Sequence, residues 1–135
     1  MIIKDTFEED VERDEYEQII NNSKNIMILK FGADWCGPCK KIAPLIDMQI
    51  DLINMYMEEK NIEKDVYYYE LCVDDYFDLY AFLKRKKMIN GIPHMVCYFP
   101  ENNQNRDYFY IPDFSVSGSK EDDIKLFFNT IKDKL

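Results

Sequence analysis

Two cysteines, Cys36 and Cys39, give the sequence its clearest chemical signal. Thiols separated by two residues can close into a small disulfide ring and open again, so the pair can exchange electrons with another disulfide. An apolar run at 26–31 precedes the pair and predicts a buried strand, and an amphipathic run that begins near Cys36 predicts a helix. Free backbone N–H groups and the positive end of the dipole at a helix N-terminus stabilise a thiolate. Cys36 is therefore the expected nucleophile, and Cys39 is expected to resolve the mixed disulfide.

A structural zinc site is the alternative for a Cys-X-X-Cys pair. Such a site needs two further ligands, and the sequence contains neither a second Cys-X-X-Cys nor a pair of histidines. Cys72, Cys97 and His94 could complete it only if the fold happened to bring them together. We therefore expect a redox pair and no bound metal.

Three further motifs accompany the dithiol. Pro44 falls inside the expected dithiol helix, Gly91-Ile92-Pro93 precedes an apolar run, and Val116-Ser117-Gly118 precedes a final amphipathic stretch. Together with Trp35-Cys36-Gly37-Pro38-Cys39-Lys40, these motifs make the chain resemble the thioredoxin family. The resemblance implies an α/β thioredoxin fold, with a central mixed sheet of four to five strands and about four helices, in a single domain over 1–135.

The resemblance also implies a function, thiol–disulfide exchange that reduces protein disulfides. Gly37 and Pro38 between the cysteines match the reductants of the family, whereas glycine and histidine there mark its oxidants and isomerases. We expect disulfide-containing protein substrates, a thioredoxin-reductase-like electron donor and no cofactor. The alternatives are a thiol oxidase or isomerase of the same fold, which assists disulfide formation, and a non-catalytic interaction module that binds through the long dithiol helix.

Substrate contacts are expected on both sides of the dithiol. Trp35, the only tryptophan, directly precedes the nucleophile, so we expect its ring to face the substrate rather than the core. The resemblance implies that Gly91, Ile92 and Pro93 form a docking loop with a cis Ile92–Pro93 bond, along which a substrate peptide pairs like an added strand. His94 follows this loop, and we expect a plain strand residue there. The alternative is a histidine that tunes protonation near neutral pH.

One position departs from the family in an informative way. Thioredoxins carry a buried aspartate six residues before the nucleophile, and this chain has Lys30 there, while Glu70 stands where the family has the partner lysine. Because an unpaired buried ammonium is costly, we expect Lys30 and Glu70 to form an ion pair beneath the dithiol. Glu70 would then take the proton-transfer role, and Lys30 would favour the Cys39 thiolate. The alternative is that both side chains reach solvent independently.

The overall composition narrows the possible partners and compartments. The chain has 135 residues and a net charge of −9, which argues against nucleic acid and against anionic membrane surfaces. No segment approaches the roughly 20 apolar residues that span a bilayer, and the acidic start predicts no secretory signal. Four cysteines without such a signal predict a reducing compartment, and Cys72 and Cys97 are expected to have no redox role. We expect a cytoplasmic monomer, or a virion protein if the source is a large DNA virus, since the richness in Asn, Ile and Lys is typical of AT-rich genomes.

The pattern of apolar residues and turns predicts the remaining elements. The expected helices are 8–21, 36–60, 76–86 and 120–134, and the expected strands are 1–4, 26–31, 66–73, 95–99 and 107–111, the last two joined by a turn at 101–105. The apolar stripe of the dithiol helix is expected to comprise Ile42, Leu45, Ile46, Leu52, Ile53 and Tyr56, interrupted by Gln49. Ser119 is the expected N-cap of the last helix.

Overall fold

Five strands form one mixed sheet in the order β1-β3-β2-β4-β5. The structure, a computed structural model, describes residues 1–8 and 10–135. The elements along the chain are β1 (Ile2–Asp5), α1 (Arg13–Asn22), β2 (Ile26–Gly32), α2 (Gly37–Glu59), β3 (Val66–Cys72), α3 (Phe77–Arg85), β4 (His94–Tyr98), the short 3-10 helix η1 (Pro100–Asn102), β5 (Phe114–Ser117) and α4 (Glu121–Asp133). The strands β1, β2 and β3 run parallel, and β4 runs antiparallel to β2 and β5.

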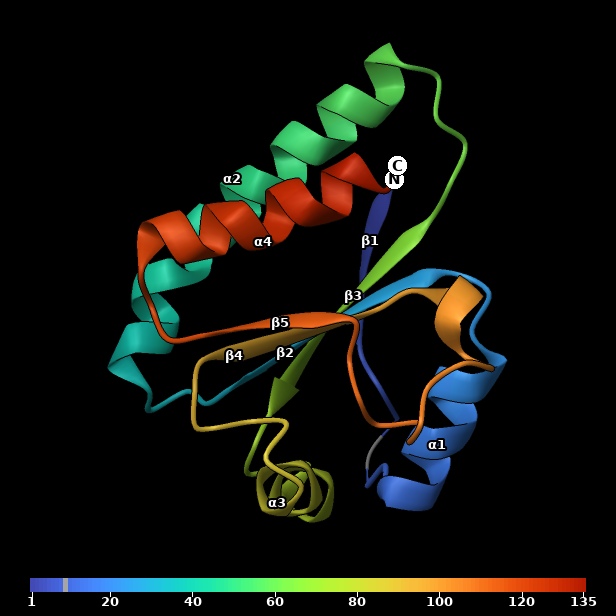
Figure 1. Cartoon of the computed structure of the whole chain (residues 1–135). Helices are drawn as coiled ribbons and strands as arrows, with labels where there is room; N and C mark the ends of the chain where they lie inside the picture. The colour runs from blue at the N-terminus through green and yellow to red at the C-terminus, as the bar shows by residue number, and fades with distance from the viewer. Residues whose placement is uncertain (9) are drawn as a thin grey trace.

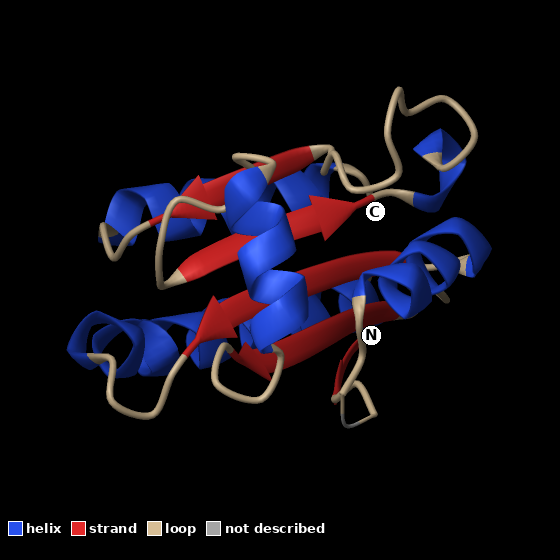
Figure 2. Ribbon diagram, turned by 90° about the horizontal axis from the view of Figure 1, so that it is seen from below, coloured by secondary structure: helices blue, strands red, loops and turns tan. Residues whose placement is uncertain are grey.

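Helices cover both faces of the sheet and bury two separate cores. Figure 1 shows α2 and α4 side by side over one face and α1 and α3 over the other, and Figure 2, turned by 90°, shows helices in front of the strands and behind them. All seven residues of β2 are buried, and their side chains alternate between the two cores. Ile28 packs with α2 and α4, whereas Leu29 and Phe31 pack with α1 and α3. The thioredoxin fold and the edge strand expected at the N-terminus are confirmed.

The first helix is shorter than expected. It begins at Arg13 rather than at residue 8, and Glu9 lies outside the described residues. Phe7 and Val11 are buried in the core of α1 and α3, and neither of these two residues is helical. The backbone N–H and guanidinium of Arg13 then bond Asp78 at the start of α3.

The stripe expected on α2 is wrong at one position and incomplete at others. Leu52 is 51% exposed, because it lies about 160° around the helix from the buried Ile50. The face that packs on the sheet is Cys39, Ile42, Ile46, Gln49, Ile50, Ile53 and Met57, so Gln49 belongs to the buried stripe.

The strand expected at 107–111 does not form. The strand that pairs with β4 is β5, Phe114–Ser117, and η1 with a following turn occupies the expected turn. The rings of Phe109 and Tyr110 pack against Phe82 of α3 instead of entering the sheet, with centroids 6.2 and 5.4 Å away. Tertiary packing therefore overrides the β propensity of this segment.

The expected N-cap of the last helix is also wrong. Lys120 occupies the N-cap position, and no side chain caps this helix end. Three acidic residues in the first turn, Glu121, Asp122 and Asp123, suit the positive end of the helix dipole.

A nearly buried ion pair fixes the loop that replaces the expected strand. Arg106 Nη2 lies 2.5 Å from Asp113 Oδ2, and the two side chains are 5% and 15% exposed. Asp113 also accepts the backbone N–H of Phe99 at 2.5 Å and the amide of Asn102 at 2.7 Å. One carboxylate thus joins the end of β4 to the segment that leads into β5.

We expect Arg106→Met to lower the free energy of unfolding by roughly 3–5 kcal/mol, because it leaves the Asp113 carboxylate nearly buried without its cation. Urea denaturation measures this change. The matched control is Lys125→Met, which removes a cation from the exposed pair with Glu121 and should leave the free energy of unfolding nearly unchanged. Equal effects of the two substitutions would contradict the role assigned to Arg106.

Candidate active site

Four loops meet at one edge of the sheet. The strands β2, β3 and β5 end there and β4 begins there, as the register pairs Phe31 with His94, Gly32 with Cys72 and His94 with Ser117. Loops at the carboxyl ends of parallel strands are the usual place for a site in α/β proteins. The expected dithiol, tryptophan and proline loop all belong to these four loops.

Cys36 and Cys39 form a disulfide at the N-terminus of α2, with Cα atoms 5.3 Å apart. Cys36 is the N-cap residue, and its Sγ accepts the backbone N–H of Cys39 at 3.2 Å. When the disulfide opens, the same N–H and the helix dipole are placed to stabilise a Cys36 thiolate. Gly37 and Pro38 occupy the first turn, where the N–H that proline lacks would have no helical partner.

The end of β2 lets the dithiol lie close to the sheet. A Cβ at Gly32 would lie 3.3 Å from Cys39 Sγ and 3.8 Å from Lys30 Cε. Any larger residue at position 32 would therefore push against the sulfur of Cys39. Because Gly32 has no side chain, the Cys39 sulfur and the end of the Lys30 side chain both lie next to the space that a Cβ would fill.

Trp35 directly precedes Cys36 and is 68% exposed. Its indole N–H donates to Asp74 Oδ2 at 2.8 Å, and the thiol of Cys72 approaches the same oxygen at 3.9 Å. Asp74 follows β3, which lies next to β2, so the register of the two strands places the carboxylate where it holds the indole. The ring faces solvent at the dithiol edge, and the alternative of a core tryptophan is wrong.

The proline loop precedes β4, which pairs with β2 on the side opposite to β3. The peptide bond between Ile92 and Pro93 is cis. The carbonyl of Pro93 accepts the N–H of Gly118 at 2.9 Å, which joins this loop to the turn before α4. Gly118 has φ +92°, a conformation that glycine adopts without strain. Gly91 and Ile92 are half-buried and retain surface for a partner.

The expected ion pair between Lys30 and Glu70 is present. Lys30 Nζ lies 2.8 Å from Glu70 Oε1, and the two side chains are 4% and 57% exposed. The hydroxyl of Tyr68 donates to the other carboxylate oxygen, Oε2, at 2.6 Å. Burial and the neighbouring carboxylate raise the pKa of Tyr68 far above its ordinary value, so the phenol remains a donor. Only Glu70 reaches solvent, so the alternative of two independent exposed side chains is wrong.

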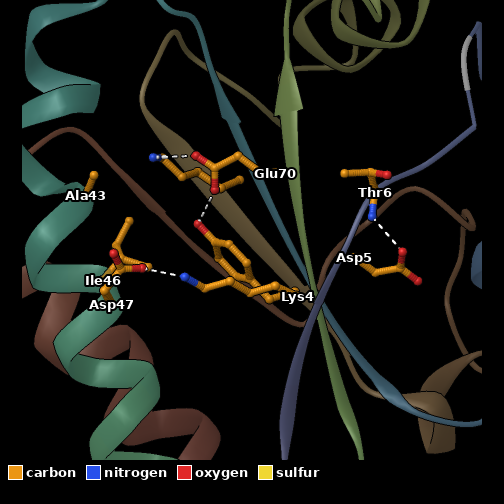
Figure 3. A pocket seen from close by; sticks show the side chains of 9 residues that line it. Lys4, Asp5, Thr6, Ala43, Ile46, Asp47 and Glu70 are labelled. Carbon is orange, nitrogen blue, oxygen red and sulfur yellow. Dashed lines mark hydrogen bonds and ion pairs between the residues drawn. The ribbon is translucent and has the colours of Figure 1, made fainter.

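This ion pair lies between two cavities. A cavity of about 170 Å³ is lined by Lys30, Glu70, Gly32, Cys39 and Cys72 among others. A larger cavity of about 520 Å³ on the same helix and sheet face is also lined by Lys30 and Glu70. Figure 3 shows the Glu70 carboxylate bridging an amine and a tyrosine hydroxyl, across from the ion pair of Lys4 with Asp47. Glu70 therefore lines both the cavity beside Cys39 and the larger cavity.

The other candidate groups include His94 and Cys97, and both are buried. His94 is a buried strand residue, and neither of its ring nitrogens has a hydrogen-bond partner among the described residues. Burial lowers its pKa to about 4, so it is neutral near pH 7. Burial raises the pKa of the Cys97 thiol well above its ordinary value. Within residues 1–8 and 10–135, no group of three or more Cys, His, Asp or Glu side chains is arranged to hold a metal ion. None of the described helices is long and apolar enough to cross a membrane.

The fold and the site define a thioredoxin-fold protein with a Cys-X-X-Cys disulfide at a helix N-terminus. The thioredoxin family model matches residues 8–109, and the chain belongs to the thioredoxin family. It is 28% identical over 112 residues to thioredoxin 3 of Plasmodium falciparum, a match that covers 82% of this chain and 51% of that protein, so it spans about half of that relative. It is 29% identical over 84 residues to thioredoxin-2 of Saccharomyces cerevisiae, covering 62% of this chain and 67% of that protein. The crystal structure of Malassezia sympodialis thioredoxin shares the fold, with a TM-score of 0.59 at 16% identity, over 98% of this chain and 96% of that one.

Two residues of the site were not expected from the sequence. Asp74 holds the indole of Trp35, and Tyr68 holds the carboxylate of Glu70. The spacing of Tyr68 and Glu70 could have indicated their contact, since residues two apart in a strand share a face. Asp74 could have been found only by placing the ends of β2 and β3 side by side.

The buried His94 makes a pH-dependent contribution to stability. Its pKa is lower in the folded protein, about 4, than the ordinary value of 6.5, so the unfolded chain binds the proton first as the pH falls. Stability is therefore unaffected by this group above about pH 6.5 and decreases between pH 6.5 and 4.

We expect the free energy of unfolding of the natural chain to fall by roughly 2–3 kcal/mol relative to that of His94→Thr when the pH drops from 7 to 4. Urea denaturation of both proteins at each pH measures the difference, and the carboxylates that titrate in this range are common to both. Parallel pH profiles for the two proteins would show that folding does not lower the pKa of His94.

Proposed function

We propose that this chain is a thiol–disulfide oxidoreductase that reduces disulfides of protein substrates. The observation that carries the proposal is the Cys36–Cys39 disulfide at the N-terminus of α2, at the sheet edge that also holds Trp35 and the cis-proline loop. Membership of the thioredoxin family supports it.

The reaction proceeds in two exchange steps. The reduced chain presents a Cys36 thiolate, which attacks one sulfur of the substrate disulfide and releases the other sulfur as a thiolate. The Cys39 thiol loses its proton and attacks Cys36 Sγ, which breaks the mixed disulfide and frees the second substrate sulfur. The substrate gains two electrons and, with two protons, becomes a dithiol, while the chain returns to the Cys36–Cys39 disulfide. An external dithiol donor must then reduce that disulfide.

Lys30 and Glu70 are positioning residues for the second step in this proposal. Cys39 is 5% exposed, so its thiolate forms in a low-dielectric environment where a nearby cation matters. Lys30 supplies that cation from the strand beneath. Glu70 contacts both Lys30 and solvent, and therefore suits transfer of the Cys39 proton to water.

The remaining parts of the proposal concern partners and location. A substrate segment pairs with the backbone of Gly91 and Ile92 and packs against the exposed ring of Trp35. A thioredoxin-reductase-like protein is the proposed electron donor, and the cytoplasm is the proposed compartment, with a monomer as the working form. A virion is the alternative location if the source is a large DNA virus.

One observation supports a bias toward oxidation, which is that Lys30 and Cys39 line the same cavity. Stabilising the thiolates of the reduced form makes the disulfide a stronger oxidant. This effect would move the chain toward the thiol oxidase of the same fold, which Pro38 between the cysteines opposes. We therefore treat Lys30 as a modifier of a reductase.

We expect the purified chain to accelerate the reduction of insulin disulfides by dithiothreitol, followed as the turbidity of the released B chain. Cys36→Ser should abolish the acceleration, because it removes the attacking sulfur. Cys72→Ser is the matched control, since it removes a thiol outside the disulfide and should retain activity. Equal rates with the natural chain and with Cys36→Ser would remove the proposed reductase function.

We expect Lys30→Met to raise the pKa of the dithiol and to slow insulin reduction at pH 7 on the order of tenfold. Glu70→Gln should lower the dithiol pKa, because it leaves the Lys30 charge uncompensated. The thiolate absorbance measured against pH gives the pKa values of the single variants and of the double variant. Additive effects in this cycle would show that the two side chains do not act as a pair.

A further inference from the structure

The outward face of α2 carries a row of exposed apolar side chains. Met48, Leu52 and Met55 are 57%, 51% and 65% exposed, and half-buried Leu45 begins the row. Leu45 also packs against the core, whereas Met48, Leu52 and Met55 lie away from the face of the helix that packs on the sheet. Large exposed apolar side chains that gather on one face mark an interaction surface more often than isolated ones do.

The spacing of the row is that of a helix–helix seam. Leu45, Met48, Leu52 and Met55 are separated by three, four and three residues, which is the a/d pattern of a coiled coil. The neighbouring elements leave this face open. Tyr56 faces α4, where the Lys132 ammonium lies 4.7 Å from its ring centroid, and Asp47 faces β1, where it pairs with Lys4 at 2.6 Å.

Acidic side chains border the row. Asp51 and Glu58 are exposed and lie seven residues apart along one edge of it, and Glu59 is exposed at its end. Between Lys41 and Lys60 the helix contains no basic residue. Coiled-coil partners place charges of opposite sign beside such a seam.

We propose that the outward face of α2 docks a basic amphipathic helix of a partner protein. Apolar side chains of that helix pack on Leu45, Met48, Leu52 and Met55, and its Lys or Arg side chains lie beside Asp51 and Glu58. The row begins six residues after Cys39, which is about 9 Å along the helix axis. A docked partner would therefore be held next to the dithiol without covering it. The proposal is independent of the reductase function, because no residue of the row belongs to the active site.

Charge argues against a second copy of this chain as the occupant. An antiparallel pair of α2 helices would set the Asp51 and Glu58 edge of one copy against the same edge of the other. Like charges that face each other across a seam disfavour pairing. The net charge of −9 on each copy adds to the repulsion.

The test uses two designed helical peptides of about three heptads, with leucine at the a and d positions. One carries lysine at the flanking e and g positions and the other carries glutamate. We expect the full chain to bind the basic peptide at least tenfold more tightly than the acidic one, as measured by fluorescence anisotropy. Amide chemical shifts should change along residues 45–59. Failure to bind the basic peptide, or shift changes confined to other elements, would overturn the proposal.

Two variants locate the binding. The triple substitution Met48→Gln, Leu52→Gln and Met55→Gln should weaken binding at least tenfold, whereas Leu126→Gln, at an exposed apolar residue of α4, should not. The double substitution Asp51→Lys and Glu58→Lys should reverse the peptide preference, and it keeps the proposal testable if the triple variant fails to fold. Unchanged affinity of both variants for the basic peptide would overturn the proposal. A dimer of the natural chain that does not form with the triple variant would also overturn it. Insulin reduction is measured with the same variants. A failure of peptide binding would leave the reductase function unaffected, and a failure of insulin reduction would leave the docking proposal unaffected.

Discussion

The parallel pairing of β2 with β3 is the constraint on which the active site depends. Its register sets Lys30 beside Glu70 and Gly32 beside Cys72, and it brings the loops that follow the two strands to the same edge. A shift of one residue in either strand would turn every side chain of that strand to the other face. Such a shift would separate the ammonium from its carboxylate and would place a side chain under Cys39. Because β2 is buried over its whole length, the two hydrophobic cores hold this register in place.

The register has an electrostatic consequence for the dithiol. The charged group beneath Cys39 on β2 is a cation, and the carboxylate that balances it stands on the neighbouring strand. In the proposed mechanism the cation favours the thiolate of the buried Cys39, and the carboxylate, which is 57% exposed, passes the proton to water. The proposed mechanism thus assigns the stabilising charge to β2 and the proton acceptor to β3. Tyr68 keeps the carboxylate in position through its second oxygen.

The sequence allowed prediction of those features that rest on local pattern or on charge balance. Residues 26–31 were predictable as a buried strand and Cys36 as a helix start from apolar runs and spacing, and the ion pair followed because a buried Lys30 requires a partner. Other features depend on contacts between distant segments. The aromatic segment at 107–111 has high β propensity, yet its rings fill the space over α3, and β5 forms from the less obvious Phe114–Ser117. The contact of Trp35 with Asp74 likewise depends on which strand ends are neighbours.

The proposed reductase function requires Cys36 and Cys39 to form a reversible two-electron couple. Trp35, the only tryptophan, lies beside Cys36 and can report its redox state by fluorescence. The most direct measurement is Trp35 fluorescence across a series of dithiothreitol redox buffers. We expect a single reversible transition with a slope of about 30 mV per tenfold change in the ratio of oxidised to reduced protein. That transition should be absent in Cys36→Ser and unchanged in Cys72→Ser. A fluorescence signal that does not respond to redox potential in the natural chain, or a transition that persists in Cys36→Ser, would contradict the assignment of Cys36 and Cys39 as this couple.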